Sequence, residues 1–190
     1  MRVLGISGSL RRDSLNSALL RAAAERLPAG AELVEFERLR SIPPYDEDAE
    51  LEGTPEAVAE LRRAMREADA VLIATPEYNH SIPGVLKNAL DWASRPAGQS
   101  ALNGKPAAVV GASTGMFGAV WAQAETRKVL GALGGRVIET ELPVARAGEL
   151  LVDGHLELSP QQSEQLEELL AELVAAIEEA AEFERERVAA

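Results

Sequence analysis

The sequence has 190 residues, a formal net charge of -12 and no cysteine. This length suits one domain, residues 1–190, with a two-layer or three-layer core. The lack of cysteine excludes disulfides, thiolate metal sites and cysteine nucleophiles. Residues 1–148 carry 17 basic and 19 acidic side chains, whereas residues 149–190 carry 2 and 12. Because an acidic surface repels nucleic acids and anionic membranes, we expect neither as a partner.

No apolar run approaches the roughly 18 residues needed to span a bilayer. The first apolar segment starts almost at residue 1, with no charged leader before it. We therefore expect a soluble cytoplasmic protein. The acidic end of the chain is interpreted as a solvated helix face rather than a binding site.

A strand, a polar loop, a helix and a second strand are predicted at the start of the chain. Residues 3–6 form a short apolar run, typical of a central strand buried on both faces. A helical apolar stripe runs from Leu15 to Leu27, with Ser14 as its expected N-cap. Residues 32–36 then alternate between polar and apolar, which favours a strand nearer an edge.

The loop between the first strand and the first helix has the composition of a phosphate site. Its glycines let backbone amides approach an anion, and Ser9 and Ser14 offer hydroxyl groups. Arg11 or Arg12 offers a charged fork, and the following helix points its positive end inward. The loop fits neither the Gly-x-Gly-x-x-Gly fingerprint nor the P-loop pattern. We interpret it as the anchor of a mononucleotide phosphate, with FMN as the candidate; a plain polar turn capped by Ser14 is the alternative.

The middle of the chain predicts a long loop, a helix, a strand and a second polar loop. Residues 39–53 show no periodicity and hold five carboxylates, which predicts a solvated loop and no metal site. A helix is expected over residues 54–68, followed by a wholly apolar strand over residues 70–75. The polar segment 76–84 leads into a helix that reaches residue 93.

The remaining elements repeat the same alternation. Residues 107–112 predict another buried strand, which runs directly into the polar loop 113–118. A helix to Leu133 and a fifth strand over residues 137–142 follow. The last helix starts at residues 159–160, and we expect it to fray beyond about residue 180, where it becomes charged.

This order predicts an α/β fold, an open five-stranded parallel sheet with helices on both faces and strand order 2-1-3-4-5. Ligands bind such sheets beyond the carboxyl ends of the strands, where the order reverses. The loops after strands one, three and four are neighbours there, so we expect them to converge on one crevice. Their hydroxyls, amides and Tyr78 suit a flat heteroaromatic ring. No catalytic triad is present around His80, so a bound cofactor is expected to carry the chemistry.

Three motifs carry a resemblance to a known family: GSLRRDSLN at 8–16, PEYNHSIPGVLKNALDW at 76–92 and GASTG at 111–115. Together they resemble the NADPH-dependent FMN reductase family, a flavodoxin-like group that includes chromate, quinone and azo-dye reductases. The resemblance implies a flavodoxin-like three-layer sandwich that binds FMN noncovalently. It places Ser9, Arg11, Ser14 and Asn16 on the phosphate and ribityl side, Pro76, Glu77, Tyr78 and Asn79 along the ring, and Ser113 and Gly115 at its far edge.

By the same resemblance, NADPH or NADH gives a hydride to the flavin, which reduces free flavin, a quinone, an azo compound or chromate. Relatives are commonly oligomers, so a homodimer or homotetramer is expected. The alternative is a non-enzymatic flavodoxin-type electron carrier, which the two arginines of the phosphate loop and the lack of an obvious aromatic pair disfavour. A phospho-receiver would need carboxylates at the end of the first strand, where residues 7–9 are serine, glycine and serine.

Overall fold

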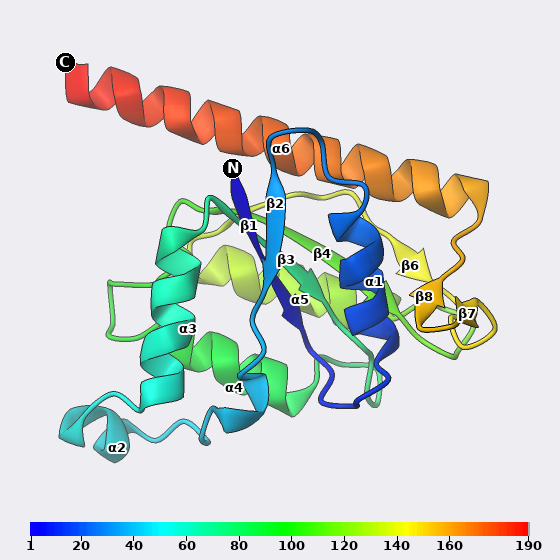
Figure 1. The fold of residues 1–190 in the computed structure, drawn as a ribbon. Helices are drawn as coiled ribbons and strands as arrows, with labels where there is room; N and C mark the ends of the chain where they lie inside the picture. Colours follow the sequence, from blue (N-terminus) through cyan, green and yellow to red (C-terminus); the bar gives the residue numbers. More distant parts are fainter. Residues whose placement is uncertain (190) are drawn as a thin grey trace.

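Parallel strands form the centre of the structure, a computed structural model that describes residues 1–189 (Figure 1). Their order is β2-β1-β3-β4-β5, and the short strand β6 also pairs with β4. The predicted fold class and strand order are therefore confirmed. The bounds are β1 (Arg2–Ser7), β2 (Glu32–Glu35), β3 (Ala70–Ala74), β4 (Pro106–Ala112), β5 (Arg136–Val137) and β6 (Pro143–Val144).

Helices cover both faces of the sheet and give a three-layer arrangement (Figure 1). Side chains of β1 alternate, so that Val3 packs with α1 (Leu15–Ala24) and α6 (Pro160–Ala189). Leu4 points the other way, toward α3 (Glu56–Glu67), α4 (Gly84–Ala93) and α5 (Val120–Ala132). Because both faces are covered, every residue of β3 and β4 is buried, which accounts for their unbroken apolar runs.

A small hairpin connects the sheet to the last helix. Strands β7 (Leu151–Val152) and β8 (His155–Leu156) pair antiparallel beside α1 (Figure 1). Arg21 of α1 donates a hydrogen bond to the carbonyl of Gly154 in its turn at 2.9 Å. Among the described residues, no helix is both long enough and apolar enough to cross a bilayer.

Two expected segments differ from the structure. Residues 39–53 are not one loop, because they contain the 3-10 helix η1 (Leu39–Ser41) and helix α2 (Glu47–Glu52). Asp46 caps α2 by accepting from the amide of Asp48 at 2.9 Å, and acidic residues in the first turn suit the helix dipole. The last helix continues to Ala189 rather than fraying near residue 180, and Arg187 pairs with Glu184 one turn earlier at 2.8 Å.

The fifth strand was also expected to be longer than it is. On this side of β4 only the two-residue strands β5 and β6 form ladders with it, and Thr140 and Glu141, between them, are outside both strands. The side chains of that connection bond to helices instead: Glu141 pairs with Arg127 of α5, and Thr140 donates to Glu172 of α6 at 2.7 Å. A segment at the edge of a sheet pairs with a strand on one side only, so its side chains can bond to neighbouring helices instead of extending the strand.

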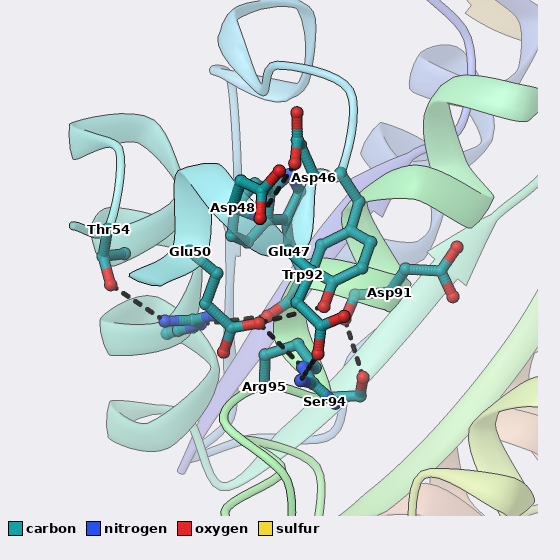
Figure 2. Close-up of polar contacts among 11 residues, drawn as sticks. Asp46, Glu47, Asp48, Glu50, Thr54, Asp91, Trp92, Ser94 and Arg95 are labelled. Carbon is teal, nitrogen blue, oxygen red and sulfur yellow. Dashed lines mark hydrogen bonds and ion pairs between the residues drawn. The ribbon is translucent and has the colours of Figure 1, made fainter. Parts of the chain in front are cut away.

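A cluster of polar contacts with Arg95 holds helix α2 (Figure 2). None of the residues of α2 is buried. Glu50 Oε2 accepts hydrogen bonds from Arg95 Nε at 2.9 Å and from the Tyr45 hydroxyl at 3.0 Å. Only 13% of the Glu50 side chain is exposed. The Arg95 hydrogen bond is the main cause that lowers the pKa of Glu50 below its ordinary value.

We expect the docking of α2 to be lost in acid. Because the folded-state pKa of Glu50 lies below the ordinary 4.5, its contribution is complete above that value and is lost as the pH falls through the folded-state pKa. Hydrogen exchange in residues 47–52, corrected for intrinsic rates, should stay slow from pH 7 to 5 and accelerate below about pH 4. Glu50→Gln should lose protection already at pH 7.

The matched control is Glu47→Gln. The Glu47 carboxylate lies 3.7 Å from Arg95, but 74% of its side chain is exposed, so it contributes little. If Glu47→Gln and Glu50→Gln accelerated exchange in α2 equally at pH 7, the Glu50 carboxylate would not be what holds the helix.

Candidate functional site

A cleft of about 210 Å³ opens at the carboxyl edge of the sheet, where the loops after β1, β3 and β4 converge. Eight of the ten predicted site residues line it, whereas Asn79 and Gly115 do not. Leu15, Ala112 and Thr114 also line it, which the sequence analysis missed although each adjoins a predicted residue. The lining residues are Ser9, Arg11, Ser14, Leu15, Asn16, Pro76, Glu77, Tyr78, Ala112, Ser113 and Thr114.

The loop after β1 presents backbone and side-chain donors at one end of the cleft. Ser14 Oγ caps α1 by accepting from the amides of Asn16 and Ser17, each at 3.2 Å. Ser9 Oγ accepts from the Arg11 amide at 3.3 Å, which tightens the loop. Within residues 1–189 the Arg11 guanidinium makes no ion pair or hydrogen bond, so its donors are free for an anionic ligand.

Asn16 joins the first loop to the end of β4. Its side-chain Nδ2 donates to the carbonyl of Ala112, and its Oδ1 accepts from the amide of the same residue, both at 3.0 Å. Asn16 is 2% exposed and Ala112 is 1% exposed. Beyond the end of β3, the side-chain amide of Asn16 thereby supplies the hydrogen bonds to β4 that a further residue of β3 would supply. Asn16 lines the cleft mainly as a brace between two loops.

The loop after β3 is a tight hairpin. Tyr78 and Ser81 exchange two backbone hydrogen bonds, of 3.1 and 3.2 Å, around a two-residue turn. Both turn residues have positive φ, 54° for Asn79 and 60° for His80, which is the geometry of a type I′ turn. Asn79 therefore sits at a turn position that favours asparagine and is exposed to solvent, while Tyr78 stands at the cleft.

The loop after β4 approaches the sheet closely before α5 begins. Gly118 has φ +57°, and a Cβ there would lie 2.5 Å from the carbonyl carbon of Pro143 in β6. Only glycine fits both requirements. The approach leaves Met116 and Phe117 exposed on the outside of the loop, at 67% and 57%.

Aromatic side chains gather beside the cleft. Trp121 of α5 packs edge-on against Phe117, with ring centroids 4.9 Å apart, and against His80, at 4.8 Å. Trp121 is 40% exposed and Tyr78 is 53% exposed. We call Tyr78, Met116, Phe117 and Trp121 the apolar rim.

Comparison with known proteins places this site in a family. The family model described as NADPH-dependent FMN reductase matches residues 1–149. The chain belongs to the NADPH-dependent FMN reductase family. It is 52% identical over 130 residues to an NAD(P)H-dependent FMN reductase of Pseudomonas aeruginosa, an alignment that covers 68% of this chain and 69% of the relative. A quinone reductase of Escherichia coli is 40% identical over 131 residues, with the same coverage.

A solved structure extends the likeness of this FMN reductase family member to its C-terminal helix. The flavoenzyme NAD(P)H:(acceptor) oxidoreductase of Paracoccus denitrificans superposes with a TM-score of 0.82 at 35% identity. The match covers 94% of this chain and 98% of that one.

The residues of the cleft fit the cofactor of an FMN reductase. The free guanidinium of Arg11 suits a phosphate, and Leu15, Pro76 and Ala112 give the cleft an apolar wall for a ring. The cleft volume of about 210 Å³ lies below the roughly 300–1,000 Å³ of sites that enclose a ligand. A cleft of this volume does not by itself enclose a whole ligand of flavin size.

Proposed function

We propose that this chain is an FMN-dependent NAD(P)H oxidoreductase that passes electrons from NADPH or NADH to a small acceptor. The acceptor classes are free flavin, a quinone, an azo compound or chromate. The observation that carries the proposal is one cleft that joins a free Arg11 guanidinium at one end to the hairpin loop of Tyr78 at the other. The family match supports the same activity.

The chain's own residues bind and orient. The Arg11 guanidinium and the hydroxyls of Ser9 and Ser14 hold the phosphate, because these three side chains line the same part of the cleft. Pro76, Tyr78 and Ser113 line the ring side. FMN supplies the hydride-accepting chemistry when bound. No side-chain acid or base is required by this division of labour.

The open side of the cleft favours an enzyme over an electron carrier. A carrier has to shield its flavin from bulk reductants and oxidants, whereas a reductase has to admit a nicotinamide and then an acceptor. The limited enclosure of the cleft leaves room for both. The proposal places the activity in the cytoplasm, where reduced nicotinamide nucleotides are available.

Anaerobic mixing of the FMN-loaded protein with NADPH, and separately with NADH, tests the proposal. We expect the visible absorbance of the flavin to bleach rapidly without any partner reductase, and to return when benzoquinone is added. Stable absorbance with both nucleotides, in a protein shown to contain FMN, would contradict the enzyme and support the carrier.

The apolar rim supports a homodimer or homotetramer as part of the same proposal. Its four large side chains are 40–67% exposed, and Phe117 packs on Trp121; clustered exposed apolar groups mark interaction sites. Light scattering of the purified protein should give a mass of two or four times 20.3 kDa. A monomer mass at micromolar concentration would contradict this part.

A further inference from the structure

Helix α5 begins without a cap of its own. Its N-cap residue, Ala119, has φ 62° and no side chain that could accept a hydrogen bond. Of the first amides, Val120 donates to Phe117 O at 3.2 Å and Gln123 donates to Ala119 O at 2.9 Å. The two amides between them, of Trp121 and Ala122, need an acceptor from outside the helix.

Glu77, in the loop after β3, supplies that acceptor. Its Oε2 accepts from the amide of Trp121 at 3.0 Å and from the amide of Ala122 at 3.2 Å. Its side chain is 13% exposed. A carboxylate in this position does what serine or aspartate does at an ordinary N-cap, and its charge also opposes the positive end of the helix.

Glu125 makes the reverse contact, from α5 to the hairpin loop. Its Oε2 accepts from the Ser81 hydroxyl and from the Ile82 amide, the latter at 3.4 Å. These bonds, that of Ser81 first, lower the pKa of Glu125, so the carboxylate is ionised at neutral pH. Two carboxylates thus cross between the same two elements in opposite directions.

We propose that Glu77 and Glu125 form a clasp that fixes the spacing of the two ring-side loops, with Glu77 as a positioning residue. The inference rests on the proposed function, because the clasp holds Pro76 and Tyr78 opposite Ser113 across the cleft. Since Glu77 occupies the start of α5, that helix end is closed to phosphate groups. Anion binding is left to the loop that contains Arg11.

Amide exchange in the flavin-free protein tests the clasp itself. In Glu77→Ala, exchange at Trp121 and Ala122 should accelerate about fivefold or more, the factor expected for loss of a cap worth roughly 1 kcal/mol. Glu77→Gln keeps one oxygen acceptor and should stay closer to the wild type. In Glu125→Ala, the faster amide should be that of Ile82. Unchanged exchange in both alanine variants would overturn the clasp, whatever the flavin does.

Flavin affinity tests what the clasp is for. Glu77→Ala should weaken FMN and riboflavin by the same factor, about five- to thirtyfold for a cap worth about 1–2 kcal/mol, because the phosphate loop is untouched. In the double variant Glu77→Ala, Glu125→Ala, the loss of binding free energy for flavin should be smaller than the sum of the losses in the two single variants, because both carboxylates hold the same spacing. If Glu77→Gln lost as much affinity as Glu77→Ala while keeping its amide exchange slow, the charge would act on the flavin and the positioning role would be wrong.

A failure of the clasp can be distinguished from a failure of the proposed function. Wild-type protein that takes up no flavin would overturn the proposed function, and the exchange measurement would still decide the clasp. Flavin uptake by the wild type, together with unchanged exchange in both alanine variants, would support the proposed function and overturn the clasp.

Discussion

Replacing Asn16 with alanine is expected to lower the free energy of unfolding by about 2–6 kcal/mol. The change removes both hydrogen bonds to Ala112 and leaves a buried amide and a buried carbonyl without partners, at about 1–3 kcal/mol each. It also releases the first loop from β4, so FMN affinity should fall together with stability. Urea denaturation of the flavin-free protein measures the first effect, at an unchanged m-value.

Two control variants test whether the hydrogen bonds between Asn16 and Ala112 cause the loss of stability. Asn16→Asp keeps an acceptor for the Ala112 amide but turns a carboxylate oxygen toward its carbonyl, so it should destabilise at least as much as alanine. Ser17→Ala, one residue along α1, removes a part-buried hydroxyl that bonds to Ser7 at 2.9 Å and should cost about 1 kcal/mol. An Asn16→Ala variant no less stable than Ser17→Ala would show that Asn16 is not a brace.

Arg11→Ala is expected to weaken FMN binding by about 10- to 100-fold. A hydrogen bond between a guanidinium and a phosphate contributes about 1.5–3 kcal/mol, and 1.4 kcal/mol corresponds to a factor of ten. Riboflavin lacks the phosphate, so its affinity should not change. Quenching of flavin fluorescence on titration measures both ligands against the same protein.

Arg12→Ala is the matched control for Arg11. It removes the same charge one residue along the chain, from a side chain that does not line the cleft. We expect a change of less than about threefold, through long-range charge alone. Equal losses in the two variants would mean that net charge near the loop, rather than the Arg11 fork, attracts the phosphate.

Much of the fold followed from the sequence because the central strands are buried on both faces. The wholly apolar runs 70–75 and 107–112 are typical of strands at the centre of a parallel sheet, and the structure places them side by side as β3 and β4. The edge was harder to predict. Residues 137–142 have the composition of a strand, but only Val137 belongs to β5, and the side chains of Thr140 and Glu141 bond to α6 and α5 instead.

Helix α2 could have been found from its cap, since Asp46 precedes an acidic first turn. It was missed because α2 buries nothing, so no apolar period marks it. Its anchor is the contact of Glu50 with Arg95, which comes from a distant part of the chain and leaves no local pattern.

The sequence predicted which three loops line the cleft, but not which contacts their polar side chains make. Sequence motifs place Asn16, Glu77 and Asn79 in polar loops, but their letters do not say which atoms they meet. In the structure Asn16 binds Ala112, Glu77 binds the start of α5, and Asn79 occupies a turn position with positive φ. Each of these depends on a partner far along the chain or on backbone geometry. A side chain capable of binding a ligand was in these cases already bonded within the protein or turned to solvent.

The most direct test of the account is to map backbone amide shifts as FMN is added to the protein, and to repeat the titration with riboflavin. FMN should shift the amides of residues 9–16, 77–78 and 112–114, while riboflavin should shift the last two groups and leave residues 9–13 nearly unchanged. No binding at micromolar FMN, or shifts gathered around Lys105 and Arg136 at the opposite edge of the sheet, would contradict a flavin site formed by these three loops.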